Sequence, residues 1–337
     1  MSLYRPLVQA GRARSEAAVV LAGGPHWFTH AERLQRGVAP EVVSVAEMPD
    51  ATLTRLSAPR AALCGLHMDR PHIMGILNAT PDSFSDGGQH AAPDLAVAYA
   101  QAMQAAGASL IDIGGESTRP GAALIPADEE IARTVPVIST LARAGAAPIS
   151  IDTRKADVAR AALQAGAGMI NDVSGLQFDP DMAATAARAD VPVCVMHAQG
   201  TPETMQANPL YGDVLLEVYD FLDAQVARLE GLGIPRGRIV VDPGIGFGKT
   251  PAHNLALIRG ISLFHGLGCV ILLGVSRKRF IGDIGQAPDA QSRAPGSIAA
   301  GLAGLAQGVQ ILRVHDVAET AQALRLWQAV QDQKGQA

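Results

Sequence analysis

The sequence contains little cysteine, few aromatic residues and no long hydrophobic run. Its 337 residues include three cysteines, Cys64, Cys194 and Cys269, and none of them belongs to a CxxC pair. Cys194 and Cys269 lie in apolar runs that are typical of strands, which favours buried, reduced thiols over a disulfide or a metal site. The first residues lack the pattern of a secretory signal, and no apolar run approaches the roughly 20 residues that cross a bilayer. We therefore expect a cytoplasmic protein.

Positive charge is also scarce. The formal net charge is −5 and the pI is near 6.0, which argues against a general nucleic-acid binder with a basic face. Any phosphate group that binds must then be held by a local cluster of cations. Hydrophobic residues make up 48% of the chain and there are 35 glycines, enough for a sizeable core and many tight turns.

One theme repeats from about His72 onward: a short apolar run, a polar turn, then an alanine-rich helical pattern. The apolar runs predict eight strands, at His72–Leu77, Ser109–Ile113, Pro148–Ile151, Met169–Asn171, Val191–Met196, Ile239–Val241, Val270–Leu273 and Val309–Leu312. Helices are predicted between them, among others at Asp94–Ala106, Glu129–Ala142, Lys155–Ala165, Val214–Leu232 and Val317–Val330. Strands that alternate with helices pair in parallel, and eight of them can close into a (β/α)₈ barrel.

The alternative to the barrel is an open, doubly wound sheet. In such a sheet functional residues gather mainly at one switch point, whereas here a polar loop with candidate residues follows nearly every strand. This distribution favours the barrel. Residues 1–70 do not follow the repeat and are interpreted as an N-terminal extension of unknown role, packed on or beside the barrel of residues 71–337. Glu41–Val45 is the clearest strand candidate in that extension.

The residues at the predicted strand ends carry the chemistry, because the sites of such barrels lie where strands end. Carboxylates and amides follow strands three, four and six, at Asp152, Asn171 and Asp242. Cations follow strands two, seven and eight, in the segments with Arg119, with Arg277-Lys278-Arg279 and with Arg313. This division suits a flat heterocycle rich in hydrogen-bonding groups on one side and a polyanion on the other.

Seven of these segments, in order, resemble the signature segments of dihydropteroate synthases. They are Asn78–Gly88, Gly114–Gly121, Ser150–Arg154, Ile170–Gly175, Val240–Gly248, Gly274–Gly282 and Arg313–Val317. The resemblance runs from about Pro71 to the end of the barrel, and seven ordered motifs make it specific. It implies a transferase that joins (7,8-dihydropterin-6-yl)methyl diphosphate to 4-aminobenzoate and releases diphosphate, in folate biosynthesis.

The resemblance also implies roles for individual residues. The residues that match the family's pterin-binding set and its apolar wall are Asp152, Asn171, Asp242, Lys278, Met196, Phe247 and Gly274. Those that match the diphosphate site are Asn78, Thr118, Arg119, Arg313 and His315, and Asn78 is expected to help bind a Mg²⁺ ion. Of these, Asp152, Asp242, Lys278 and Arg119 are expected to act directly in the reaction.

The 4-aminobenzoate pocket is expected from Phe84, Pro120, Lys278 and Arg279, and Asp86 lies in the same pair of closing loops. Here the sequence departs from the family, because many members have serine where Arg279 stands. That position contacts the 4-aminobenzoate carboxylate, so Arg279 either becomes a cationic partner or points to solvent. The departure concerns affinity for 4-aminobenzoate and for sulfonamides, which target this enzyme class, and leaves the reaction class unaffected.

The implied reaction is an SN1-like substitution. Diphosphate leaves the pterin methylene group, the electron-rich ring stabilises the cation, and the weakly basic aniline nitrogen attacks. The family also implies a homodimer through late barrel helices, and the segment 293–307 is rich in the small residues that allow close packing.

Three other motifs resemble known sites only superficially. The segment 244–250 looks like a P-loop, but Pro243 stands where the first glycine is required. His197 and His315 have no close histidine or cysteine partner, so zinc is not expected. The short basic run 277–279 follows a buried strand in an acidic chain, which argues against a nucleic-acid patch.

Two rival functions remain open from the sequence. A pterin-binding methyltransferase would share the Asp and Asn residues but has no need of a diphosphate site, so the presence of Asn78, Arg119 and Arg313 favours the synthase. A catalytically silent paralogue would act as a scaffold, and the intact loops with Phe84 and Thr118 argue against it. Release of diphosphate that depends on 4-aminobenzoate distinguishes the synthase from both rivals, because neither of them would give it.

Overall fold

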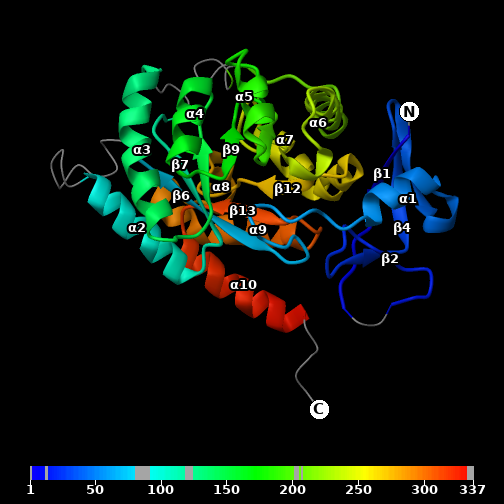
Figure 1. Ribbon diagram of the computed structural model, residues 1–337. Coiled ribbons are helices and arrows are strands. Elements are labelled where there is room, and N and C mark those ends of the chain that lie inside the picture. Colours follow the sequence, from blue (N-terminus) through cyan, green and yellow to red (C-terminus); the bar gives the residue numbers. More distant parts are fainter. Residues whose placement is uncertain are drawn as a thin grey trace.

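A closed barrel of eight parallel strands forms the body of the protein in the computed structural model (Figure 1). The structure describes residues 2–11, 14–79, 92–117, 124–200, 205 and 208–331, and Thr80 to Ala91 and Thr118 to Ala123 are among those outside it. The barrel strands are β6 (His72–Asn78), β7 (Leu110–Gly114), β8 (Ile149–Asp152), β9 (Met169–Asp172), β10 (Val193–Met196), β11 (Ile239–Asp242), β12 (Val270–Leu273) and β13 (Ile311–Val314). Each pairs with its sequence neighbours, and β13 pairs with β6 to close the ring.

Helices follow every barrel strand and cover the outside of the ring. They are α2 (Ala92–Ala106), α3 (Ala127–Arg143), α4 (Ala156–Ala165), α5 (Met182–Ala189), α6 (Val214–Gly231), α7 (Pro251–Arg259), α8 (Arg279–Gly285), α9 (Ala294–Leu305) and α10 (Val317–Gln331), with 3₁₀ turns η3 (Arg236–Arg238), η4 (Ile261–Leu267) and η5 (Ala290–Arg293). The predicted (β/α)₈ barrel is confirmed, and the open sheet is excluded by the β13–β6 pairing.

One predicted strand was misplaced. The run Val309–Leu312 was expected, whereas β13 spans Ile311–Val314, so Arg313 lies inside the strand and does not follow it. A guanidinium is tolerated there because carboxylates on β7 and β8 bind it inside the barrel, at Asp112 and Asp152.

The N-terminal residues form a small unit beside the barrel (Figure 1). Its elements are β1 (Leu3–Pro6), β2 (Val19–Val20), β3 (Trp27–Phe28), β4 (His30–Gln35), β5 (Val38–Ser44), η1 (Val45–Glu47) and α1 (Asp50–Ser57). The expected strand at Glu41–Val45 lies largely within β5, which is the edge of a three-stranded sheet ordered β1-β4-β5. A separate apolar cluster around Phe28 and Leu56 gives this unit its own core.

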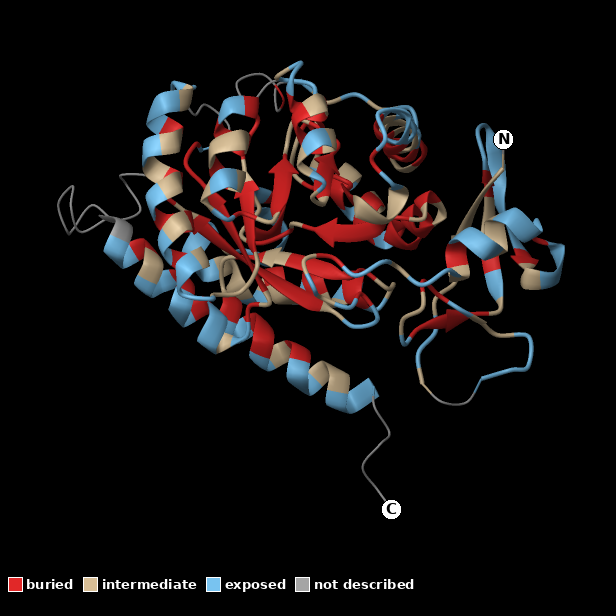
Figure 2. Cartoon of the chain, viewed as in Figure 1, coloured by how far each residue is buried: buried red, intermediate tan, exposed pale blue. Residues whose placement is uncertain are grey.

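The core of the barrel has two parts, and Figure 2 shows the strands as its most buried elements. The larger part lies between the strands and the helix ring, and the smaller part fills the bottom of the barrel. Leu63 and Met68 belong to the smaller part and pack with Met74 and Val240 inside the ring. The floor of the barrel therefore includes residues that precede position 70.

Candidate functional site

The alternation of side chains along each strand builds the site. Inside the ring, the lower layer is apolar, with Leu110, Met169, Cys194, Val240, Leu272 and Ile311 in one cluster. Two residues further along six of the strands, the same face carries Asp112, Asn171, Met196, Asp242, Gly274 and Arg313. Because strands have a period of two, an apolar floor and a polar layer follow from the same pattern. The polar layer lies at the carboxyl ends of the strands, where barrel enzymes hold their sites.

Two ion pairs and a hydrogen bond join four strands in this layer. Arg313 donates from Nε to Asp112 Oδ2 at 2.6 Å and from Nη2 to Asp152 Oδ2 at 2.6 Å. Asn171 Nδ2 donates to the same Asp112 oxygen at 3.0 Å. The network therefore brings Asp152, Asn171 and Arg313 together, as predicted from the strand ends, and it fixes them relative to one another.

Asp112 is the residue that the sequence analysis missed. It was included in the apolar run of β7 and given no role, yet it is fully buried and binds both Arg313 and Asn171. The signal was present, because a lone carboxylate inside a buried strand requires a partner. Only the ring closure reveals that this partner comes from the last strand.

Burial governs the protonation of the two predicted acids. Burial raises the pKa of Asp152 to about 7, although the Arg313 guanidinium opposes the shift, and the neighbouring Asp112 adds to it. Burial likewise raises the pKa of Asp242 to about 6, against a hydrogen bond from the Gly244 amide and the charge of Lys278. Both carboxylates are thus held in a site that favours their neutral forms more than water does.

Asp242 is aimed by the loop that follows β11. Its Oδ1 atom accepts the Gly244 N–H at 2.7 Å, which leaves the second oxygen for another donor. A Cβ atom on Gly274 would lie 3.6 Å from Asp242 Oδ2, so the lack of a side chain there keeps this edge of the carboxylate open. Met196 is paired in register with Asp242 on the adjacent strand and is buried.

Lys278 lies beside the same loop. Its Nζ atom is 4.1 Å from the centroid of the Phe247 ring, a cation–π contact. Gly246 allows this approach, since a Cβ atom there would lie 3.1 Å from Lys278 Cδ. Phe247 and Lys278 therefore form one side of the site next to Asp242, as the predicted pterin set requires.

The predicted diphosphate and 4-aminobenzoate residues are only partly described. Asn78 is half-buried at the end of β6, and His315 contacts Ser276 Oγ through its backbone N–H at 3.1 Å and through Nδ1 at 3.0 Å. The side chain of Arg279 is 92% exposed and lies 3.9 Å from Asp283 in a loose ion pair. The predicted residues Phe84, Asp86, Thr118, Arg119 and Pro120 lie outside the described residues.

A buried ion network lies just after β7, where the described segment 92–117 ends. Glu116 binds Arg154 Nη2 at 3.0 Å and Lys155 Nζ at 2.9 Å, and Lys155 also binds Glu130 at 2.6 Å. Arg154 lies over the Phe178 ring at 4.5 Å. This network fixes the chain up to Glu116 against β8 and α3.

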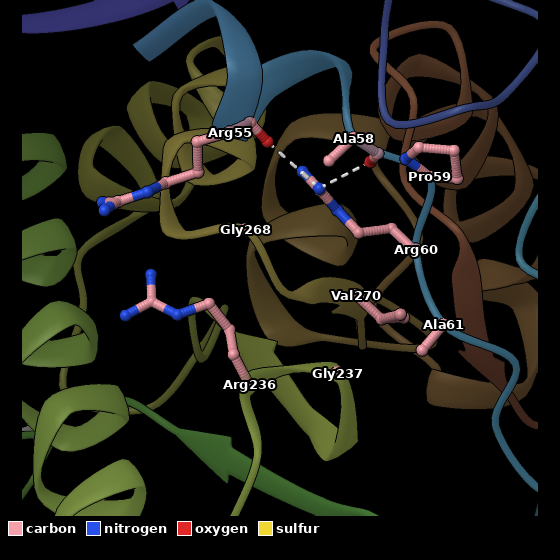
Figure 3. A pocket seen from close by; sticks show the side chains of 9 residues that line it. All are labelled: Arg55, Ala58, Pro59, Arg60, Ala61, Arg236, Gly237, Gly268 and Val270. Carbon is pink, nitrogen blue, oxygen red and sulfur yellow. Dashed lines mark hydrogen bonds between the residues drawn. The ribbon is translucent and has the colours of Figure 1, made fainter. Parts of the chain in front are cut away.

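A cavity of about 250 Å³ lies away from the mouth, at the seam between the N-terminal unit and the barrel (Figure 3). Its arginines are already engaged. Arg60 donates to four backbone carbonyls, including those of His265 and Cys269, and Arg236 binds Glu230 and the Leu267 carbonyl. The Arg60 bonds to His265 and Cys269 hold the two units together, whereas those of Arg236 lie within the barrel, and the cavity contributes nothing to the polar layer.

The described part of the chain contains neither a metal-binding cluster nor a membrane-spanning helix. No group of three or more His, Cys, Asp or Glu side chains lies close enough together there to hold a metal ion. No helix among the described residues is both long and apolar enough to span a membrane.

Comparison with known proteins places the chain in a family. A family model described as pterin binding enzyme matches residues 74–315. Dihydropteroate synthase of Escherichia coli is 45% identical over 264 residues, which make up 78% of this chain and 93% of the relative. The chain belongs to the dihydropteroate synthase family. The matched residues contain every predicted site position, from Asn78 to His315, and exclude the N-terminal unit.

Solved structures of dihydropteroate synthases share this fold. Xanthomonas albilineans dihydropteroate synthase with 4-aminobenzoic acid is 46% identical, with a TM-score of 0.76, and the match covers 81% of this chain and 98% of that chain. The same enzyme in complex with 7,8-dihydropteroate is 44% identical, with a TM-score of 0.74, covering 81% and 99%.

Proposed function

We propose that the polar layer at the barrel mouth condenses (7,8-dihydropterin-6-yl)methyl diphosphate with 4-aminobenzoate, giving 7,8-dihydropteroate and diphosphate. The observation that carries the proposal is the convergence of Asp152, Asn171 and Arg313 in one hydrogen-bonded network, in the same layer as Asp242. The Xanthomonas structures, whose ligands include one of these substrates and this product, support it.

The acids and the amide recognise the pterin ring. The open edge of Asp242 accepts N–H donors from the 2-amino-pyrimidinone, and an ionised carboxylate makes such bonds strong. Asp152 and Asn171 serve other ring nitrogens, while Lys278 donates to a ring acceptor. Phe247 and Met196 supply apolar contacts beside the ring, and the missing side chain at Gly274 leaves space next to Asp242.

Cations at the mouth balance the charge of the leaving group. The C–O bond between the pterin methylene and the diphosphate breaks, and its electron pair departs with the diphosphate. The proposed contacts of the diphosphate stabilise the charge that develops on it, and they come from Arg313, His315, Thr118 and Arg119. The amino nitrogen of 4-aminobenzoate then forms the new C–N bond and loses a proton to solvent.

The donor set at the mouth fits Mg²⁺. Asn78 offers an amide oxygen at the end of β6, and Mg²⁺ commonly takes one or two protein oxygens together with substrate phosphates and water. When bound, the ion would neutralise diphosphate charge. Phe84, Pro120 and Lys278 complete the proposal as the residues around 4-aminobenzoate, while the predicted fourth residue, Arg279, has a side chain that is 92% exposed and faces solvent.

The experiment is a steady-state assay of diphosphate release by the purified chain with Mg²⁺ and the dihydropterin diphosphate. Release should depend on added 4-aminobenzoate and should yield dihydropteroate in equal amount. The Asp242→Asn variant is the matched control and should lose most turnover. No release, or release that ignores 4-aminobenzoate, would contradict the proposal and favour the methyltransferase or scaffold readings.

The homodimer belongs to the same proposal, although its sequence argument changes. The glycines of α9 pack on the chain's own barrel, since a Cβ atom on Gly304 would lie 2.4 Å from Leu273 and one on Gly301 would lie 3.2 Å from Leu312. A dimer through the late helices therefore has to use their outer faces. Sedimentation equilibrium at micromolar concentration tests it, with a monomer mass as the contrary result.

A further inference from the structure

Lys249 is a buried amine that the proposed reaction does not use. It follows the glycine-rich loop after β11 and is only 3% exposed. Its Nζ atom lies 2.9 Å from His197 Nδ1, 3.0 Å from the Phe247 carbonyl oxygen and 3.4 Å from the His197 carbonyl oxygen. In its ammonium form the side chain has three N–H donors, and these three acceptors use all of them.

These acceptors belong to two different loops. His197 follows β10 directly after Met196, and Phe247 follows β11 and Asp242. The loops are in backbone contact, because a Cβ atom on Gly244 would lie 1.8 Å from the His197 carbonyl oxygen. Two carbonyl dipoles and a ring nitrogen thus converge on one point, and the Lys249 ammonium lies at that point.

The His197 ring can accept the hydrogen bond from Lys249. Burial and the charge of Lys249 lower the pKa of His197 to about 3, so the ring is neutral at working pH. With Lys249 as the donor of their hydrogen bond, Nδ1 carries the lone pair and Nε2 carries the proton. The edge of the ring packs on Phe221, with ring centroids 4.9 Å apart, which fixes its orientation.

Other bonds fix the same loop at different points. The Gly246 N–H donates to Asn254 Oδ1 at 2.8 Å, and the Tyr211 hydroxyl donates to the Gly248 carbonyl at 2.9 Å. Neither bond involves Phe247, whose carbonyl is held by Lys249 and whose ring is 4.1 Å from Lys278 Nζ. The Phe247 N–H donates to the Gly244 carbonyl within the same loop at 3.1 Å, and Lys249 is the described side chain that joins the Phe247 carbonyl to the loop after β10.

We propose that Lys249 is a positioning residue of the pterin site, which holds the loop after β11 against His197 so that Phe247 and Lys278 present one fixed surface to the pterin ring. The inference rests on the proposed function, because the ring it positions for is the pterin of that reaction. It assigns no contact between Lys249 and either substrate.

The first test is Lys249→Met, which keeps the length of the side chain and removes its donors. The KM for the dihydropterin diphosphate should rise about tenfold, the expected scale for losing one charged hydrogen-bonded contact. The KM for 4-aminobenzoate should stay within about twofold. Burial lowers the pKa of Lys249 to about 7, so removing the charge relieves a cost, and the melting temperature should stay within about 5 °C of wild type.

A matched pair at His197 covers the case in which Lys249→Met fails to fold. Asparagine places an acceptor oxygen where Nδ1 lies, whereas glutamine places its polar group where Nε2 lies. The KM of His197→Asn for the pterin substrate should therefore lie closer to wild type than that of His197→Gln. Equal effects of the two changes would overturn the inference.

Other outcomes are equally decisive. An unchanged pterin KM in Lys249→Met would overturn the inference while leaving the proposed function intact, since wild-type turnover is measured in the same assay. If Lys249→Met raised both KM values and lowered kcat and the melting temperature together, Lys249 would have only a structural role, which would overturn the inference. Absent wild-type turnover would refute the proposed function itself, and calorimetry with 6-hydroxymethylpterin would then decide the inference from the affinities of wild type and Lys249→Met.

Discussion

Replacing Asp242 by asparagine should weaken function and strengthen the fold at the same time. The carboxylate is buried and its pKa is raised to about 6 from an ordinary 3.8, because burial disfavours the charge more than Gly244 and Lys278 favour it. The folded state therefore binds more protons than the unfolded state between about pH 4 and pH 6. As pH rises through this window, ionisation of Asp242 removes stability.

The size of the effect follows from the shift. Two pKa units at about 1.4 kcal/mol each give about 3 kcal/mol of destabilisation once the pH is well above 6, and about 1.6 kcal/mol at pH 5. Asparagine resembles the protonated acid, and its oxygen can still accept the Gly244 N–H. Asp242→Asn should therefore be more stable than wild type by up to about 3 kcal/mol at pH 8, and by about half as much at pH 5.

The assay is urea unfolding of both proteins without ligand, at pH 5 and at pH 8, together with calorimetry using a simple pterin. The variant should lose pterin affinity at both pH values, because an amide accepts fewer N–H donors than a carboxylate. Should the variant be less stable than wild type at pH 8, or should the difference not depend on pH, the reasoning about the buried charge fails.

Three further outcomes are expected. Arg313→Met leaves Asp112 and Asp152 without their cation and should lower the free energy of unfolding at pH 8 by about 3 kcal/mol, a loss that shrinks towards pH 5 as Asp152 protonates; equal loss at both pH values in urea unfolding would speak against it. The kcat/KM for the pterin substrate should fall below about pH 6 as Asp242 protonates, and a profile that stays flat down to pH 5 would contradict this. Arg279→Ser should change the KM for 4-aminobenzoate by less than about fivefold because the side chain is 92% exposed, and a larger change would mean that Arg279 turns towards the substrate.

The barrel could be predicted because its signals are local. Each strand is a short apolar run, and each polar turn marks the end at which functional residues are found. The strand with Arg313 was misplaced for a physical reason: a guanidinium in a strand is tolerated only through carboxylates on β7 and β8, far away in sequence. Asp112 was missed for the same reason, since its partner is 201 positions away.

The N-terminal unit shows a different limit. Its strands are short, and β2 and β3 have two residues each, too few for a period to be read. The contribution of Leu63 and Met68 to the barrel floor also has no local pattern, because it depends on a ring of strands that closes only at β13.

Arg60 fastens the N-terminal unit to the segment that enters β12, through the carbonyls of His265 and Cys269. That attachment lies at the amino-terminal ends of the barrel strands. The N-terminal unit is therefore fixed on the side opposite the polar layer, where small molecules are proposed to bind. A tether or a fused enzyme joined ahead of β1 would therefore add bulk on the closed side only. Immobilising the protein through its N-terminus should therefore leave the entry of substrates and the release of products unobstructed.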